Sequence, residues 1–191
     1  GVMVLPSYVE MLRLREPIGN VAALIIIVGA ALWLGLFVCA IASKWLLIGR
    51  YKPGAYPLWG HYYLRWWVAS RLQHLSGMSI FNGTPLAPVV WRLMGARVGR
   101  RCVINAVLPY AWDCISIGDD VSIGDDTQLP GLRVENGYLL VGSVTVGSRC
   151  FIGCHSALGL DVRMQDDAGL DDQSLLPDGE EISEIGRASC R

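Results

Sequence analysis

Apolar residues recur at every sixth position through the last part of the chain. The repeated positions are Val146, Ile152, Leu158, Met164, Leu170, Leu176 and Ile182. Glycine follows each of the first three, and the same apolar–glycine pair recurs upstream at Ile117 and Ile123. A period of six cannot keep one side of an α-helix apolar, because successive repeats walk around its surface. The period suits a triangular coil, in which each hexad forms a short strand with its apolar residue inward and turns a corner at glycine.

Stacked coils of this kind bury a continuous apolar prism, which is the architecture of a parallel β-helix. The hexads begin at Val98 and continue to Ile182, so residues 98–183 are predicted to form this domain. The frame breaks across residues 105–114 and 130–138, and both segments are predicted to be loops ejected from the coil. The remaining hexads predict about two to three turns, whose open ends must be capped by the preceding helices or by a partner.

A different pattern, apolar on every side, fills residues 21–43, which contain no charged residue. A helix needs about 20 apolar residues to cross a bilayer, because lipid offers the backbone no hydrogen-bond partners. A buried core helix rarely runs this long without a polar face, and a signal peptide has a shorter apolar run that begins nearer the start. Residues 21–43 are therefore predicted to be a transmembrane helix in the cell membrane.

The flanks of this segment predict its orientation. Basic and acidic residues alternate in front of it. Behind it no acidic residue occurs until Asp113, and the nearest basic residues are Lys44, Arg50, Lys52, Arg65 and Arg71. Because Lys and Arg concentrate on the cytoplasmic side, the β-helix domain is predicted to be cytoplasmic. Residues 1–20 are then the extracytoplasmic flank or the end of a preceding segment, and a start at Gly1 rather than at methionine suggests further spans upstream.

The segment 44–97 is an aromatic and basic linker with helices. Pro53-Gly54 and Pro57 predict turns, and from Leu58 aromatic side chains at i, i+4 spacing predict a helix. Two compatible interpretations remain for these rings: contact with the headgroup layer, or burial against the following domain. A second helix is expected from Thr84 to Gly95. Nucleic acid is not an expected partner, because the net charge is −1 and the aromatic–basic stretch adjoins the predicted span.

The last residues, IGRASCR, match the translation of a sequencing-adapter read-through, so 184–191 are predicted to be a non-native tail. Without Cys190 the cysteines are Cys39, Cys102, Cys114, Cys150 and Cys154. They show neither a CxxC pair nor a zinc-type spacing, so no metal site is expected. Their expected state is reduced, as small hydrophobic residues.

The hexad column resembles the repeat of left-handed β-helix acyltransferases. A narrower resemblance comes from the order of segments along the chain. After the predicted span come KWLLIGRYKPGAYPLWG, GTPLAPVVWRLMGARVG, SIGDDVSIGDD and VGSVTVGSRCFIG. This order is similar to the C-terminal region of membrane-bound non-ribosomal peptide synthetases of the ε-poly-lysine synthetase type. This resemblance implies a mainly β fold: a single-stranded left-handed parallel β-helix behind a transmembrane helix and amphipathic helices.

The resemblance also implies partners and chemistry. The β-helix domains of such synthetases condense amino acids delivered as thioesters, so the expected partners are the membrane, carrier and adenylation domains of the same polypeptide, sister β-helix domains and copies of the same chain. No cofactor is expected in this fragment itself. A phosphopantetheine thioester would sit on the separate carrier domain.

Candidate catalytic residues are few. In hexapeptide acyltransferases a loop histidine acts as the base, but the comparable loop here, residues 131–140, holds Arg133 and Glu135 and no histidine. His155 is the remaining candidate catalytic residue, although strand alternation turns it outward, as for an ordinary surface histidine. Cys154 is a weaker candidate. Carboxylates cluster after the predicted corners, where they suit solvated turns or a surface that attracts amines.

The leading hypothesis is a fragment of a membrane-bound peptide synthetase whose β-helix domain takes part in amide-bond formation between carrier-bound and free amino acids. One alternative is a non-catalytic membrane scaffold or docking domain of the same synthetase, which the missing loop histidine favours. Another is a free-standing membrane acyl- or acetyltransferase that uses acetyl-CoA.

Overall fold

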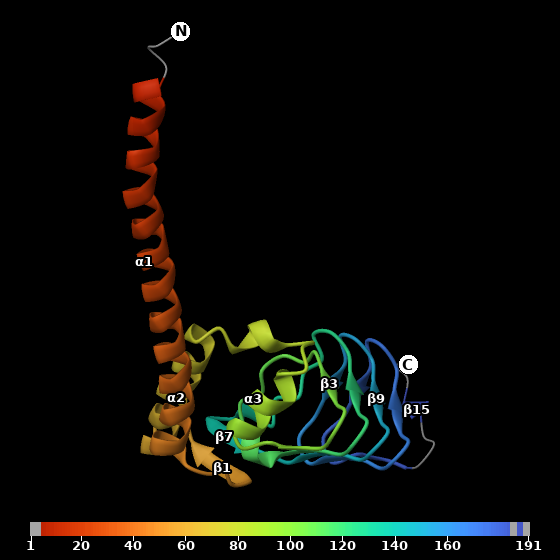
Figure 1. Ribbon diagram of the computed structural model, residues 1–191. Coiled ribbons are helices and arrows are strands. Elements are labelled where there is room, and N and C mark those ends of the chain that lie inside the picture. The colour runs from red at the N-terminus through yellow and green to blue at the C-terminus, as the bar shows by residue number, and fades with distance from the viewer. Residues whose placement is uncertain (1–4, 184–186, 189–191) are drawn as a thin grey trace.

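The computed structural model describes residues 5–183 and 187–188. A long helix, α1 (Leu5–Ser43), leads into a body made of short helices and a β-solenoid, and it runs clear of that body for much of its length (Figure 1). Residues 20–36 of α1 are exposed on all sides. Among the described residues, the one helix long and apolar enough to cross a membrane is Asn20–Ile48. The predicted span 21–43 lies within it, and the helix continues upstream into the segment predicted as a flank.

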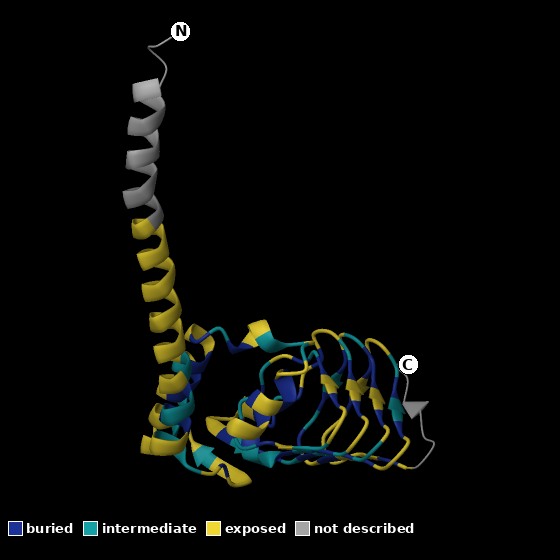
Figure 2. Ribbon diagram, viewed as in Figure 1, coloured by how far each residue is buried: buried dark blue, intermediate teal, exposed yellow. Residues whose placement is uncertain are grey.

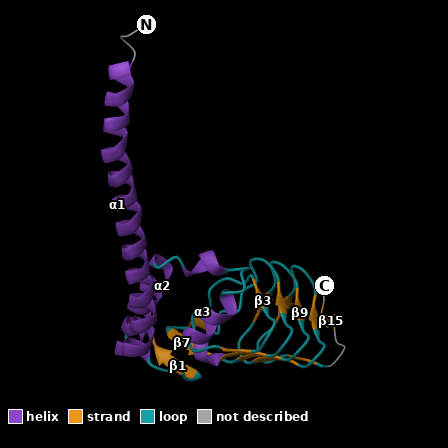
Figure 3. Cartoon of the chain, viewed as in Figure 1, coloured by secondary structure: helices purple, strands orange, loops and turns teal. Residues whose placement is uncertain are grey.

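The solenoid has three sides, two of them formed by five-stranded parallel sheets (Figure 3). The first side consists of β2 (Arg97–Val98), β4 (Ile115–Ile117), β8 (Val144–Val146), β11 (Val162–Met164) and β14 (Glu181–Ile182). The second consists of β3 (Val103–Ile104), β5 (Ser122–Ile123), β9 (Phe151–Ile152), β12 (Gly169–Leu170) and β15 (Arg187–Ala188). The third carries β10 (Ala157–Leu158) and β13 (Leu175–Leu176).

The hexad positions line the interior of this solenoid. Ile152 and Leu170 are fully buried and face each other in register, and Leu158 is 1% exposed. Burial alternates along the strands, as Figure 2 shows for the solenoid. The predicted fold class, a left-handed parallel β-helix behind an apolar helix, is confirmed. The number of turns was predicted wrongly, because the solenoid has about 5.

The two frame breaks explain the missing turns. In the first, the chain still runs alongside the next coil, since the Val107 N–H donates to the Thr127 carbonyl at 2.9 Å. It then forms the short 3-10 helix η3 (Trp112–Cys114). Likewise the Gln128 bridge to Ala157 continues the third side without a hexad. Residues 105–114 were predicted to be an ejected loop, but backbone pairing keeps this segment in the coil where the side-chain pattern is lost.

The second break contains a β-hairpin rather than an irregular loop. Strands β6 (Leu132–Glu135) and β7 (Tyr138–Val141) meet at Asn136-Gly137, which have φ values of 50° and 80°. Two left-handed residues are what a tight type I′ turn requires. The outer edge of β7 pairs with β1 (Gly54–Pro57), a strand where only turns were expected. Pro57 is accommodated because β1 is an edge strand.

The corners differ from the expectation that glycine makes the turn. Left-handed backbone falls two residues later, at positions such as Asp120 (φ 57°), Arg149 (φ 58°) and His155 (φ 55°). Glycine is needed for another reason: a Cβ on Gly118 would lie 2.6 Å from the carbonyl carbon of Gly147 in the next coil. The repeated glycine therefore permits the close stacking of coils.

Short helices cover the first coil and join it to α1. They are the π-helical turn η1 (Lys44–Ile48), α2 (His61–Leu75), the 3-10 helix η2 (Met78–Phe81) and α3 (Ala87–Leu93). The rings of Trp91 and Trp112 meet edge to face, with centroids 5.5 Å apart, so α3 caps the open end of the apolar prism. Burial of the aromatic linker against the following domain has support, because Trp66 packs on Tyr110; contact with the headgroup layer stays a prediction for exposed rings such as Trp59.

Candidate functional site

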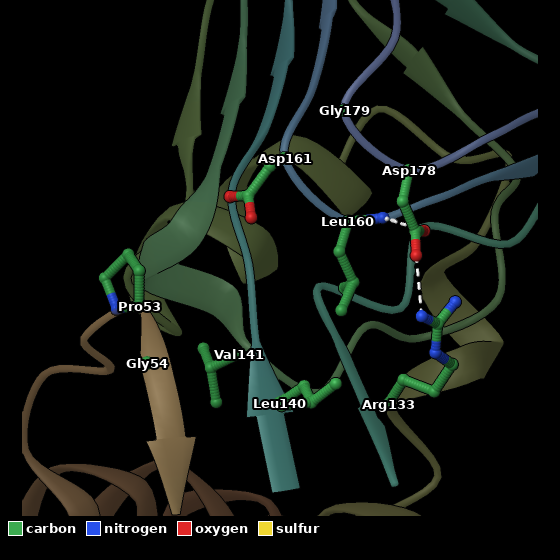
Figure 4. Close-up of a pocket in the computed structure, with 9 residues that line it drawn as sticks. All are labelled: Pro53, Gly54, Arg133, Leu140, Val141, Leu160, Asp161, Asp178 and Gly179. Atoms are coloured by element: carbon green, nitrogen blue, oxygen red, sulfur yellow. Dashed lines mark hydrogen bonds and ion pairs between the residues drawn. The ribbon is translucent and has the colours of Figure 1, made fainter. Parts of the chain in front are cut away.

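Two clefts lie where the β6–β7 hairpin leaves the solenoid. The larger, about 470 Å³, is bounded by β1, the hairpin and the third corners of the coils (Figure 4). The smaller, about 310 Å³, lies along the third side. Arg133, Leu160 and Asp178 line both, so the two clefts adjoin. Their walls combine apolar side chains, such as Leu140 and Val141, with charged groups. This arrangement suits an elongated ligand with an apolar stem and a polar end.

An ion pair fastens the hairpin across these clefts. One Nη of Arg133 lies 2.6 Å from Oδ2 of Asp178 and 3.0 Å from the carboxylate of Glu135 (Figure 4). The Leu160 N–H donates to the other oxygen of Asp178 at 2.8 Å. This backbone hydrogen bond, together with the Arg133 guanidinium, lowers the pKa of the Asp178 carboxyl below its usual value. The carboxylate is therefore a weak base and acts as an anchor.

The other corner carboxylates also accept hydrogen bonds from neighbouring coils. Oδ1 of Asp161 accepts from the Ser143 N–H at 2.8 Å, and Asp166 accepts from Ser148 N–H at 2.7 Å. Asp172 accepts from the Cys154 N–H at 2.7 Å. Each carboxylate satisfies a backbone donor that the corner leaves out of the sheets. The acidic clusters therefore have a structural role at the corners, which favours the first of their two interpretations.

One corner carries a column of alternating charge. Arg101, Asp120, Arg149 and Asp167 occupy the same left-handed position in four successive coils. Arg149 contacts Asp167 through two hydrogen bonds of 2.7 and 2.6 Å, and Arg101 pairs with Asp120. The neighbouring arginines lower the pKa of both aspartates. Because these pairs are exposed, they set corner register more than they add stability.

His155 occupies the second corner and lies outside the lining of both clefts. Its side chain is 62% exposed, and its Nε2 lies 3.7 Å from Oδ2 of Asp126. Asp126 and Gln173 hold the same left-handed position in the neighbouring coils. The outward orientation agrees with the alternation in the sequence. Since neither of the two described clefts reaches it, a catalytic role for His155 stays a prediction.

A buried polar cluster, which the sequence did not single out, joins α1 to the first coil. Lys44 is fully buried, with its Nζ 2.8 Å from Oδ2 of Asp113, and the Tyr51 N–H donates to the same carboxylate oxygen at 3.0 Å. Burial raises the pKa of the adjacent Cys114 thiol to about 11, so this thiol is protonated at neutral pH. From the sequence, Lys44 serves only as a signal of membrane orientation, because its partner Asp113 lies 69 residues away along the chain.

The weaker candidate, Cys154, lies outside both clefts and is partly exposed at the second corner. Within the described residues, no group of three or more His, Cys, Asp or Glu side chains is placed to hold a metal ion. The clefts were missed because their polar residues come from a hairpin and a distant coil. The Asn136-Gly137 pair, a strong hairpin signal, could have revealed the hairpin.

Comparisons with known proteins place this geometry in context. No established family profile matches the chain. Over 172 residues it is 29% identical to the delta-poly-L-ornithine synthetase of Acinetobacter baumannii (strain AB307-0294). The match covers 87% of this chain but 13% of that protein, so the chain spans about one eighth of its relative's length.

Two solved structures are also similar. A maltose O-acetyltransferase from Clostridium difficile 630 matches with a TM-score of 0.47 and 12% identity, over 74% of this chain and 89% of that one. A hexapeptide-repeat acetyltransferase from Vibrio cholerae matches with a TM-score of 0.41 and 12% identity, over 58% and 83%. The resemblance that the sequence suggested is confirmed: this chain is similar to a poly-amino-acid synthetase, and it contains a β-helix domain.

Proposed function

We propose that this chain is the membrane-anchored β-helix part of a non-ribosomal poly-amino-acid synthetase, and that it takes part in amide-bond formation between a carrier-bound and a free amino acid. The observation that carries the proposal is the similarity to delta-poly-L-ornithine synthetase, which extends over 87% of this chain. It covers the apolar helix, the aromatic linker and the solenoid together. A shared solenoid alone would be weaker support, since one fold hosts many functions.

The adjoining clefts beside the hairpin are the proposed binding site. A phosphopantetheine arm on a carrier domain would present the aminoacyl group as a thioester. The apolar walls formed by Leu140, Val141 and Leu160 fit the methylene parts of such an arm, and Arg133 stands where the two clefts adjoin. These residues would hold the two reacting groups together. Such positioning by itself substantially lowers the activation free energy of a reaction between two molecules.

The proposed reaction is thioester aminolysis. The neutral amine nitrogen of the free amino acid attacks the thioester carbon, a C–N bond forms, and the C–S bond breaks. The leaving thiolate takes up the proton that the amine loses. The paired carboxylate of Asp178 is too weak a base to take that proton at neutral pH. The chain's contribution is therefore proposed to be positioning, and His155, which lies outside both clefts, stays a predicted base without a role in this step.

Membrane attachment is part of the proposal. Helix α1 is long and apolar enough to cross a bilayer, and it is exposed on all sides over residues 20–36. Lys and Arg predominate after it, which favours a cytoplasmic β-helix domain. The proposed partners are adenylation and carrier domains of the same polypeptide, sister β-helix domains, and further copies of the chain.

Narrowing the larger cleft tests this function in the intact synthetase. Leu140→Trp would fill the cleft, whereas Val134→Trp adds the same ring to an exposed position of the hairpin that lines neither cleft. We expect Leu140→Trp to lower polymer formation at least about tenfold, with adenylation and carrier loading unchanged. Val134→Trp should retain full activity. Normal polymer formation by Leu140→Trp would refute the role of the cleft.

A second candidate is a non-catalytic scaffold of the same synthetase. It is favoured by the position of His155 outside both clefts and by a hairpin without histidine. A scaffold would keep polymer formation in Leu140→Trp but lose it when the docking of the carrier is blocked elsewhere on the solenoid.

A further inference from the structure

Two contacts fix the height of the solenoid along α1. At the upper level, the ring of Phe81 in η2 lies 6.1 Å from that of Trp33. The chain then enters the first coil almost at once, since the Gly83 N–H donates to the Ile104 carbonyl at 2.8 Å. Beside this contact, a Cβ on Gly77 would lie 3.5 Å from the indole nitrogen of Trp33. The first coil is therefore held close to the level of Trp33.

At the lower level, the ion pair of Lys44 and Asp113 joins the end of α1 to the opposite part of the same coil. Eleven helical residues separate Trp33 from Lys44, which corresponds to about 16 Å along the axis. The solenoid thus lies beside this segment of α1, as Figure 1 shows.

This placement conflicts with a bilayer that covers all of residues 20–48. The solenoid carries charged corners, such as the exposed pair Arg101–Asp120, and charged groups are excluded from hydrocarbon. If the whole body stayed in water, its neighbouring helix segment would lie outside the hydrocarbon with it. The apolar helix left above the body runs from Asn20 to Trp33, about 20 Å, whereas a hydrocarbon core is about 30 Å thick.

The face of the body beside Trp33 offers a way to reduce this mismatch. Three apolar side chains, which we call the rim, are exposed on it: Leu75 (70%), Ile80 (70%) and Leu86 (53%). The chain has no Asp, Glu, Lys or Arg between Arg71 and Arg92. Figure 2 shows exposed residues along this edge, where α1 leaves the body. An exposed apolar surface without charged residues, continuous with an apolar helix, suits contact with lipid better than contact with water.

We propose that the rim of Leu75, Ile80 and Leu86 enters the adjacent leaflet, so that the body rests on the bilayer as an interfacial domain; this rests on the proposed span of α1. The hydrocarbon boundary then lies near Phe37, whose ring is 5.6 Å from that of Phe81. The apolar path from Asn20 to Phe37 is about 26 Å, which a bilayer accommodates by slight thinning. Residues from Cys39 onward lie at the headgroups or in water.

Single-cysteine variants of the chain in phosphatidylcholine–phosphatidylglycerol vesicles test this boundary. Each would carry a bimane label and be exposed to acyl-chain-brominated lipid and, separately, to iodide on both sides of the membrane. Suitable positions are Gly29→Cys, Ile80→Cys, Leu46→Cys and Leu175→Cys in a background in which all six native cysteines are replaced by alanine, with native Cys39 restored as a fifth variant. Gly29 has open space at its Cβ, and Leu46 and Leu175 are 84% and 61% exposed.

We expect quenching by brominated lipid to be at least about twofold stronger for Gly29→Cys and Ile80→Cys than for Leu175→Cys. Labels at Cys39 and Leu46→Cys should respond to iodide. Circular dichroism melting confirms that each variant is folded, and Leu86→Cys serves as a second rim position if Ile80→Cys is not.

Three outcomes would overturn the proposal. If Ile80→Cys responds to iodide as Leu175→Cys does, the rim lies in water. If it is protected from both quenchers, a protein segment covers the rim. If Cys39 and Leu46→Cys are quenched by brominated lipid, the boundary lies where hydropathy alone places it. A response of Gly29→Cys to iodide would reject the span itself, which separates failure of the membrane anchor from failure of the rim.

Discussion

The ammonium of Lys44 lies 2.8 Å from a carboxylate oxygen of Asp113, and this buried ion pair joins the last turn of the long helix to the first coil of the solenoid. The same ammonium lies 3.6 Å from the centroid of the Trp45 ring, and the Tyr51 N–H completes the bonding of the carboxylate. A π-helical turn, η1, begins at Lys44. Helix α1 and the solenoid are therefore held in a fixed position relative to each other.

Breaking this pair from one side should be strongly destabilising. We expect Lys44→Met to lower the free energy of unfolding by about 3–5 kcal/mol, because the Asp113 carboxylate is left buried without a cation. Replacing both partners, as in Lys44→Met/Asp113→Leu, should recover much of the loss. Urea unfolding in detergent micelles, followed by circular dichroism, measures the difference. Arg149→Met, which breaks an exposed pair with Asp167, is the matched control and should leave the midpoint unchanged.

Close stacking of the coils predicts a second effect. In Gly118→Ala the new methyl group would meet the backbone of Gly147 at 2.6 Å, so the coils must separate locally. We expect a loss of about 1–3 kcal/mol in the same unfolding assay. Gly35→Ala on α1 has open space around the added carbon and should not destabilise the chain. An unchanged midpoint for Gly118→Ala would show that the coils can yield.

The hairpin anchor should depend on pH. The folded-state pKa of Asp178 is lowered from 3.8 by the Leu160 N–H and by Arg133, so its stabilising contribution is present above pH 3.8 and is lost as the pH falls through the lower folded value. Hydrogen exchange, corrected for intrinsic rates, should show the Leu160 amide losing protection on acidification.

Two comparisons make this measurement specific. The Gly124 amide bonds to the Ile152 carbonyl at 2.8 Å without a carboxylate, so its protection should hold over the same pH range. In Asp178→Asn the Leu160 amide should be less protected at neutral pH and insensitive to acid. Persistence of the acid sensitivity in Asp178→Asn would assign it to another group.

The exposed corner position of His155 predicts a mild phenotype for its replacement. Asparagine tolerates left-handed backbone, so His155→Asn should fold with unchanged stability. We expect polymer formation by the intact synthetase to stay within about twofold of the wild type, whereas loss of a general base costs about 10²-fold or more. A large fall in kcat with unchanged KM would instead establish the histidine as the catalytic base.

How far the sequence predicts this protein differs between its parts. The sequence predicts that Ile152, Leu158 and Leu170 point inward, because a β-solenoid of this kind repeats its buried side-chain positions every six residues. One segment without the repeat was predicted wrongly: residues 105–114 stay in the coil through backbone hydrogen bonds, which leave no side-chain pattern. The hairpin at Asn136-Gly137 had a local signal, but its pairing with β1 joins segments about 80 residues apart.

The sequence by itself determined the apolar helix and the solenoid, since both follow from the spacing of apolar side chains along the chain. Only the tertiary structure decided where the clefts lie, because Arg133 and Asp178 meet through a hairpin folded onto a distant coil. It also decided the height of the solenoid beside α1, through contacts at Trp33 and Lys44. Hydropathy measures the affinity of a segment for lipid. Contacts between distant residues determine which part of that segment remains free to contact the lipid.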